Sequence, residues 1–410
     1  MRTVAEHRAE ILGAVTPVDA VEVPLREAGG RTLAADVTAA MDLPLWDNSA
    51  MDGFAVRFAD VDGASSDSPV SLRVVGDVPA GSPLDPRFGS GEAVRIMTGA
   101  PLPAAADTVV PFEATTGGLA DSLGVATIAR GPRARGAHVR RRADDASTGD
   151  VVIAAGERLG AWQLAAASAV GVPAVRVTRA PRVAVFSTGD ELRPPGTPLL
   201  RGQIPESNAT LLAGLVAEAD AEVVIRASVG DDPAAFLSAL EEARAADVDV
   251  VISSGGVSAG AFEVVKIALS DTAAVHFRSV AMQPGRPQAF GVLAGGALFF
   301  GLPGNPVGVA VSFEVFVRPA LLHLQGRRVL DRPVMRLAAA SGWRTPPARR
   351  QYVPVRVIRD DPQRWTVRPV GAGPGAHLAG ALGRADAFAV IEAGSADVDP
   401  GDVLDVMLLP

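Results

Sequence analysis

The chain has 410 residues, more than a single hydrophobic core usually organises, so several domains are expected. Its net charge of -8 at pH 7 argues against a broad nucleic-acid-binding surface, because such a surface needs a surplus of cations. The sequence contains no cysteine, which excludes disulfides, thiolate metal sites and cysteine nucleophiles.

The N-terminal residues predict an amphipathic helix. Thr3 and Glu6 have the spacing of a capping box, and apolar residues recur near helical spacing from Val4 to Val15. Charged residues interrupt this stretch, so it lacks the apolar centre of a signal peptide, and no run reaches the roughly 18 apolar residues of a membrane helix. We therefore expect a cytoplasmic protein that does not bind membranes.

The chain changes texture several times, which predicts a multi-domain α/β plus β fold. Residues 41–136 contain short β-rich runs between Gly and Pro turns and predict an inserted β domain. The segments on either side, 1–40 and 137–178, are expected to form a discontinuous helical linking domain. Residues 329–410 again alternate short strands with turns, and we expect a small closing β barrel or sandwich.

Residues 179–328 predict a central, doubly wound parallel sheet, because strands alternate with helices along this stretch. Two helix starts are marked by a potential capping side chain before a proline, in Asp232-Pro233 and Asn305-Pro306. Ligands of such folds bind beyond the carboxyl ends of the strands. The turns at that edge are therefore the candidate ligand-binding segments.

Three strand-to-helix turns there carry polar groups. The glycine-rich loop after the strand at 250–253 offers successive backbone N–H groups, as a phosphate cradle does, although a simple tight turn is an equally good interpretation. It has neither the Rossmann nor the P-loop spacing. In a second turn, Asp190 and Glu191 could hold Mg²⁺ or accept from hydroxyls, with helix capping as the simpler alternative. The third turn, 301–306, adds further backbone donors.

Other charged motifs fit an oxyanion beside a metal ion. Arg140-Arg-Arg-Ala-Asp-Asp145 joins three guanidinium groups to two carboxylates, although solvated surface charge is the usual explanation of such a run. Arg286 lies on a Pro-Gly turn, and simple pairing with Glu263 would account for Lys266. The histidines show neither zinc-ligand spacing nor a Ser-His-Asp set.

Taken together, these segments resemble the molybdopterin molybdenumtransferase family. The matching stretches are, in chain order, 47–57, 95–101, 140–145, 186–192, 252–258 and 301–306. The resemblance implies four domains in an elongated homodimer, with the active site between the pterin-binding parallel-sheet domain and the partner's β domain. It also implies that adenylylated molybdopterin exchanges AMP for molybdate in the presence of Mg²⁺.

The resemblance also implies roles for particular residues. Those expected to act in catalysis are Asp52, Arg140, Asp145, Lys266 and Arg286. Those expected to bind the pterin and its phosphates are Ser187, Thr188, Gly189, Asp190, Ser253, Ser254, Gly255, Gly256, Ser258, Pro303, Gly304 and Asn305. Those expected to hold the metal ion are Glu191, Asp231 and Glu263.

Two departures and two alternatives accompany this interpretation. Many relatives carry lysines where this chain has Gln283 and Arg286, and aspartate where it has Glu263, so oxyanion affinity is less firmly implied than the fold. A non-catalytic pterin-binding scaffold would not need Asp52, Arg140 and Asp145 together. A nucleotide pyrophosphatase on the same domain would use water in place of molybdate.

Overall fold

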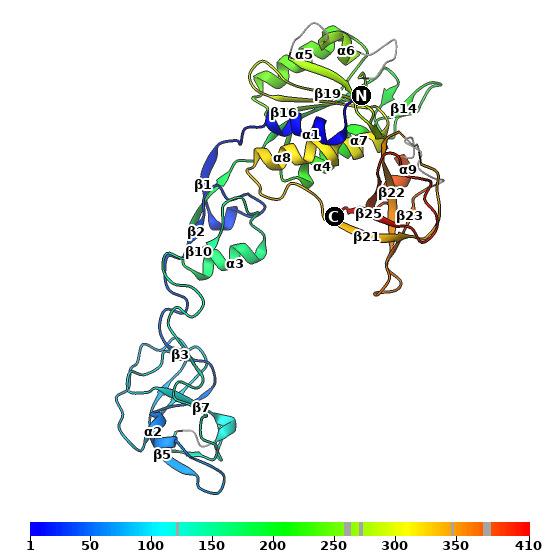
Figure 1. The fold of residues 1–410 in the computed structure, drawn as a ribbon. Coiled ribbons are helices and arrows are strands. Elements are labelled where there is room, and N and C mark those ends of the chain that lie inside the picture. Colours follow the sequence, from blue (N-terminus) through cyan, green and yellow to red (C-terminus); the bar gives the residue numbers. More distant parts are fainter. Residues whose placement is uncertain (120–122, 258–263, 270–273, 346–347, 372–378) are drawn as a thin grey trace.

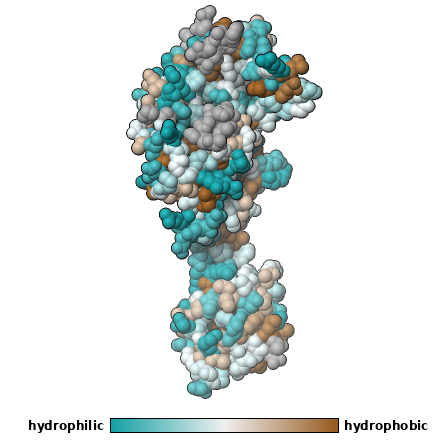
Figure 2. All heavy atoms as spheres, turned by 90° about the vertical axis from the view of Figure 1, so that its right-hand side faces the viewer, coloured by the Kyte–Doolittle hydropathy of each residue, from teal (hydrophilic) through white to brown (hydrophobic). Residues whose placement is uncertain are grey.

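The computed structural model describes residues 1–119, 123–257, 264–269, 274–345, 348–371 and 379–410. The chain is elongated (Figure 1): the α/β domain and the C-terminal barrel lie at one end, and the inserted β domain lies at the other. A narrow waist separates the two bodies when the molecule is viewed from the side (Figure 2). The predicted multi-domain α/β plus β class is confirmed.

The α/β domain is built on a six-stranded sheet with helices on both faces. In spatial order its strands are β15 (Glu222–Val229), β12 (Arg182–Thr188), β16 (Val250–Ser254), β20 (Leu298–Leu302), β19 (Pro287–Val292) and β17 (Val275–Ser279). The first four are parallel, as predicted, whereas β19 and β17 are antiparallel to their neighbours. The predicted parallel sheet is thus formed by β15, β12, β16 and β20, and two antiparallel strands extend it on one side.

The helices cover the sheet because successive strand residues face opposite sides. In β12, Val183 and Val185 enter one core, and Ala184 and Phe186 enter the other. The helices of the domain are α4 (Asn208–Glu218), α5 (Pro233–Ala245), α6 (Val264–Leu269), α7 (Pro306–Ser312) and α8 (Arg318–Leu324). Asp232 caps α5 by accepting from the Ala234 N–H at 3.0 Å, as predicted.

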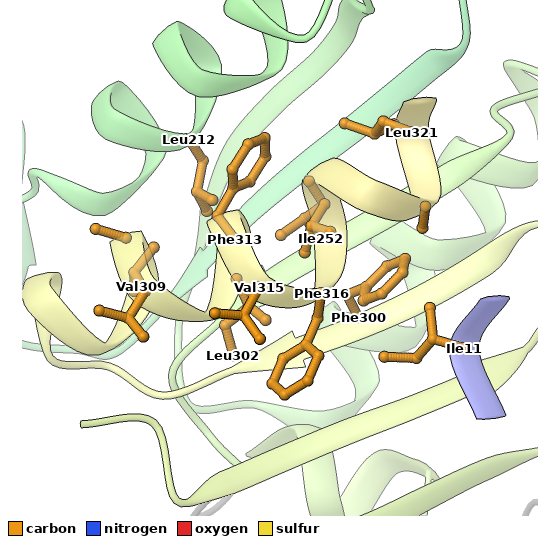
Figure 3. Close-up of a cluster of buried hydrophobic side chains, with 14 of the residues drawn as sticks. Ile11, Leu212, Ile252, Phe300, Leu302, Val309, Phe313, Val315, Phe316 and Leu321 are labelled. Atoms are coloured by element: carbon orange, nitrogen blue, oxygen red, sulfur yellow. The ribbon is translucent and has the colours of Figure 1, made fainter. Parts of the chain in front are cut away.

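One continuous helical segment runs through the centre of this domain (Figure 3). It comprises α7, a π-helical turn at Phe313–Val317 and α8, and its 306–324 span is apolar enough to cross a membrane, but 89% of the apolar window is buried inside the protein. The buried Glu314 carboxylate is neutralised by Arg332, whose two nitrogens each lie 2.9 Å from it. The segment is therefore the core helix of a folded domain.

Helix α1 (Val4–Gly13) packs against this central segment. Its capping box is confirmed by hydrogen bonds between Thr3 and Glu6 in both directions. Ile11 is fully buried near Phe316 (Figure 3), in the core of the α/β domain. We expected this helix to belong to the same domain as the rest of residues 1–40. It packs instead on the α/β domain, because that domain covers its apolar face.

Burial of His7 on α1 makes stability depend on pH. Its ring is 1% exposed and packs edge-on against Phe316 at 4.8 Å. Burial lowers the pKa of His7 from 6.5 to about 4, opposed by Glu10 and assisted by the charges of Arg2 and Arg278. The unfolded chain therefore binds this proton first as pH falls.

We expect the free energy of unfolding to fall by about 3 kcal/mol between pH 6.5 and pH 4 on account of His7, because protonation of the buried ring is disfavoured. In His7→Leu this component of the pH dependence is lost, as measured by urea unfolding. His276→Gln, which removes an exposed histidine, should retain it. Equal pH dependence in wild type and His7→Leu would contradict the assignment.

A linking module lies between the α/β domain and the β domain (Figure 1). Its elements are β1 (Ala20–Pro24), a 3-10 turn (Leu25–Glu27), β2 (Val37–Thr38), β10 (Val151–Ile153), α3 (Ala161–Ala169) and β11 (Ala174–Thr178). The carboxylate of Asp220, just after α4, accepts two hydrogen bonds of 2.8 Å from the Arg158 guanidinium of this module. It also accepts from Arg327. This cluster anchors the module to the α/β domain.

The inserted β domain has its own sheet. In spatial order the strands are β7 (Thr108–Pro111), β4 (Gly53–Val56), β6 (Glu92–Ile96), β5 (Val70–Val78) and β8 (Val125–Ile128), with short helical turns at Phe58–Val61 (α2) and Phe112–Ala114. At its inner end β3 (Asn48–Ser49) pairs with β9 (Val139–Arg140). This pairing places Asn48 opposite Arg140.

The C-terminal region is a closed barrel, which decides between the barrel and the sandwich that we expected. Its strands are, in spatial order, β22 (Arg350–Ile358), β23 (Thr366–Pro369), β21 (Val334–Ala339), β25 (Val403–Leu408) and β24 (Ala387–Ile391), and β24 pairs back to β22. Strand β18 (Met282–Gln283) of the preceding domain also joins β22. The barrel is thereby joined to the edge of the α/β domain, close to α9 (Ala379–Leu382).

Candidate active site

A cavity of about 930 Å³ opens at the carboxyl ends of β12, β16 and β20. All three predicted turns contribute to its wall, because parallel strands in register end at the same edge. The predicted site residues that line it are Thr188, Gly189, Glu191, Asp231, Ser254, Gly255, Gly256, Arg286, Pro303, Gly304 and Asn305. A short pair of parallel strands, β13 (Leu192–Arg193) and β14 (Ile204–Pro205), forms a further part of the rim.

The turns pack directly on one another, and glycine is required where they touch. Gly255 has φ +94°, and a Cβ there would lie 2.7 Å from the Thr188 hydroxyl. Its N–H donates to the carbonyl of Leu302 at 3.0 Å. The Thr188 hydroxyl in turn donates to the carbonyl of Ser254 at 3.3 Å. Any side chain at position 255 would separate the turns.

The serines of the predicted cradle divide into two groups. Ser187 is fully buried and shares a 3.0 Å hydrogen bond with Ser228, so it supports the sheet away from the cavity. The hydroxyls of Ser253 and Ser254 are buried without a hydrogen-bond partner among the residues that the structure describes. Of these three, only Ser254 lines the cavity. Ser258 lies outside the described residues.

Two acidic turns are joined at the rim. The Asp231 N–H donates to the Asp190 carboxylate at 3.1 Å, and the Asp190 N–H donates to the Asp231 carboxylate at 3.3 Å. Glu191 and Asp231 line the cavity, whereas Asp190 does not. Within the described residues no three acidic or histidine side chains gather to hold a metal ion, and the expected third ligand, Glu263, lies outside them.

The positive charge of the cavity comes from two different domains. Arg286 follows the cis peptide Gln283-Pro284, and its Nε donates to the Ser279 hydroxyl at 3.0 Å. Arg349, which directly precedes β22 of the barrel, also lines the cavity and donates to the side chain of Gln283 at 3.4 Å. Lys266 is exposed on α6 and is not part of the cavity wall.

Arg349, Glu206 and Asn208 are among the lining residues that the sequence did not predict. Asn208 donates to the Gly304 carbonyl at 2.7 Å, and Glu206 accepts from the Ala209 N–H at 2.6 Å. Glu206 and Asn208 could have been suspected from their position at the start of α4. Arg349 belongs to no local motif, because it approaches from another domain. Asn305, predicted as a capping side chain, forms no capping bond and instead lines the cavity.

A buried amide holds the turn that carries Arg286. Gln288 is 2% exposed, and its Nε2 donates to the Gly285 carbonyl at 2.6 Å and to the Ser312 hydroxyl at 2.7 Å. Ser312 is fully buried on α7, so the amide fixes the turn to the central helix. The position of Arg286 therefore depends on the Gln288 hydrogen bonds. Because these groups are buried, water cannot replace the bonds when they are lost.

We expect Gln288→Leu to lower the free energy of unfolding by about 1–3 kcal/mol, because it leaves a buried carbonyl and a buried hydroxyl unpaired. Chemical denaturation measures the change. The double variant Gln288→Leu, Ser312→Ala should lose less than the sum of the two single variants, since it also removes one orphaned group. A loss of under about 0.5 kcal/mol in Gln288→Leu would show that the amide does not hold the turn.

The remaining predicted catalytic residues lie outside the cavity. Asp52 accepts from both the N–H and the hydroxyl of Thr98 at 2.7 Å, and these bonds, the backbone one first, lower the pKa of its carboxyl. Arg140 and Asp145 are exposed near the β3–β9 pair. The linking module separates this region in space from the α/β domain (Figure 1). A single chain therefore does not bring these three residues to its own cavity.

The charged run around Arg140 is only partly explained by ion pairs. Arg141 pairs with Asp47 at 2.5 Å, and Arg142 pairs with Asp42. Within the described parts of the chain, the Arg140 guanidinium forms no ion pair. Arg141 and Arg142 therefore join this run to residues 42–47 through ion pairs, while Arg140 is exposed.

Comparison with known families covers almost the whole chain. Residues 2–171 match the MoeA N-terminal region (domain I and II), residues 184–323 the probable molybdopterin binding domain, and residues 336–409 the MoeA C-terminal region (domain IV). The three matches follow one another in chain order. They define a class of protein with two N-terminal domains, a pterin-binding-type α/β domain and a C-terminal domain.

Individual relatives agree with this class. Molybdopterin molybdenumtransferase 2 of Mycobacterium tuberculosis is 43% identical over 92% of each chain, and the molybdopterin molybdenumtransferase of Haemophilus influenzae is 33% identical over 99% of this chain and 98% of its own. A crystal structure of a molybdopterin biosynthesis MoeA protein from Pyrococcus horikoshii OT3 has a TM-score of 0.81, 26% identity and 100% coverage of both chains. The chain belongs to the molybdopterin molybdenumtransferase family.

Proposed function

We propose that this protein is a cytoplasmic molybdopterin molybdenumtransferase that inserts molybdate into adenylylated molybdopterin with release of AMP. The observation that carries the proposal is the cavity at the carboxyl edge of the sheet, where three glycine-containing turns meet two arginines. Backbone donors and guanidinium groups suit a pyrophosphate and a second oxyanion. Because the chain has no cysteine, the sulfur ligands of molybdenum come from the substrate.

The turns would hold the adenylylated pterin. The loop at Ser254–Gly256, together with Gly304 and Asn305, presents its polar groups to the cavity. Arg286 would attract molybdate and offset the charge that develops on AMP as the phosphoanhydride bond breaks. Arg349 adds a second cation to the same wall. Lys266, which lies outside the cavity wall, would act only at longer range.

The donor set is compatible with Mg²⁺. This ion prefers one or two carboxylates together with substrate phosphates and water, and Glu191 and Asp231 offer two carboxylates to the cavity. When bound, it would polarise the phosphate oxygens and assist departure of AMP. Asp190 would support this pair indirectly, because its reciprocal bonds with Asp231 fix the two turns.

We further propose that the active site is completed by a second copy of the chain. Asp52, Arg140 and Asp145 belong to the inserted β domain and to its junction with the linking module, which hold them apart from the α/β domain of the same chain (Figure 1), so a homodimer would bring the partner's β domain to the cavity. The two hydrogen bonds from Thr98 keep the Asp52 carboxyl ionised and fixed in direction. Such a group could position the ion or its water.

Two assays separate this proposal from its alternatives. Purified protein is given adenylylated molybdopterin, Mg²⁺ and molybdate, and both AMP release and molybdenum retained in the product are measured. Molybdate-dependent release with retained metal is expected for the transferase. Binding without turnover would indicate a scaffold, and AMP release without molybdenum uptake would indicate a pyrophosphatase.

We expect Asp52→Asn to stop molybdenum insertion while leaving folding and pterin binding intact, since the amide keeps the size of the side chain and removes its charge. Turnover, thermal unfolding and pterin affinity are compared with those of the wild type. Asp60→Asn, which alters another carboxylate of the β domain, serves as the control. Unchanged turnover in Asp52→Asn would reject its role.

Mixing variants tests the shared site directly. Asp52→Asn and Arg286→Gln chains are each expected to be inactive, and reassembly of the two at equal amounts should restore about a quarter of the wild-type activity, because half of the dimers are mixed and each has one intact site. No recovery despite verified mixing would place both residues in the same chain's site.

A further inference from the structure

A second, smaller hollow lies on the C-terminal barrel, and three of its six lining residues are arginines. Its volume is about 560 Å³, and its wall consists of Arg356, Arg368, Pro369, Val370, Gly371 and Arg384. None of the three arginines belongs to the candidate active site. A hollow of this size falls within the range of small-molecule sites.

The strand register forces two of these charges together. Arg356 on β22 and Arg368 on β23 are direct cross-strand partners. Their neighbours Val355, Val357 and Val367 are buried in the barrel core, so both guanidinium groups extend to the outer face. Like charges placed directly opposite each other destabilise a sheet unless something neutralises them.

The protein itself does not supply that neutralisation in the part that the structure describes. There, the side chains of Arg356, Arg368 and Arg384 form no ion pair or hydrogen bond. Asp386, the nearest acidic residue in sequence to Arg384, is engaged by Arg359 at 2.8 Å and by the Val357 N–H at 2.6 Å. The adjoining residues 372–378 contain neither Asp nor Glu.

We propose that this hollow is an anion-binding site for a phosphorylated small molecule. Three guanidinium groups offer paired donors that match the oxygens of phosphate, and a bound dianion would remove the repulsion between Arg356 and Arg368. The site is also connected to the catalytic cavity: Ala379, at the start of α9, lines the cavity, and Arg384 follows the end of the same helix. Occupancy would therefore fix one part of the cavity wall.

The test uses inorganic pyrophosphate as the probe and the full-length chain at physiological ionic strength. Calorimetric titration of Arg368→Gln should show binding to this site weakened by about tenfold or more, because a bidentate charged donor is lost. Arg336→Gln also removes an exposed charge, from β21 of the same barrel, but this residue lies outside the hollow, so the affinity of the variant should remain within about twofold of the wild type. Titration of Arg286→Gln shows how much of the measured pyrophosphate binding occurs in the catalytic cavity, because this variant loses a cation only there.

Thermal unfolding provides an independent test, because the proposal predicts that Arg368→Gln is more stable than the wild type without pyrophosphate but is stabilised less by adding it. Without pyrophosphate, Arg368→Gln should melt about 1–3 °C higher than the wild type, because the cross-strand repulsion is gone. With pyrophosphate, the wild type should gain stability and Arg368→Gln should gain little. The proposal is overturned if Arg368→Gln and Arg336→Gln bind pyrophosphate equally, or if the only binding is abolished by Arg286→Gln.

Discussion

The contact on which the functional architecture depends is the close approach of the strand ends at Gly255. The three central strands β12, β16 and β20 are parallel and in register, so their carboxyl ends reach the same edge together. There the backbone of Gly255 fits between Thr188 and Leu302, in a conformation that only glycine adopts without strain. Three polar turns that are distant in sequence thereby become one wall.

Polar contacts behind the cavity wall hold the three turns in place. Each turn is fixed by polar contacts to an element outside itself: Gln288 connects the Arg286 turn to α7, Asn208 connects α4 to Gly304, and Asp190 and Asp231 bind each other's backbone. Because buried or half-buried polar groups are costly to leave unpaired, these contacts hold the lining residues in defined positions. Preorganisation of this kind is what oxyanion binding requires.

The charged residues of the proposed active site are divided between two distant domains of the chain, as a homodimer with a shared site requires. Two arginines from different domains face the cavity, while the acidic Asp52 and the exposed Arg140 lie on the inserted β domain, which the linking module separates from the α/β domain. The Asp220 cluster anchors this arm to the α/β domain. The direction of the arm, and hence where a partner could meet the cavity, depends on that anchor.

Features that depend on local chemistry could be predicted from the amino-acid sequence. The capping box at Thr3, the alternation of strands and helices, the glycine-rich turns and the order of motifs are written in short segments, because helix caps, strand periodicity and left-handed turns are set by neighbouring residues. The three turns that contribute to the cavity wall could therefore be located from the sequence. Tertiary structure alone decided that α1 packs on the α/β domain, that Arg349 reaches the cavity from the barrel and that Arg356 meets Arg368. These contacts join residues that have no local pattern in common, and only packing and strand register bring such residues together.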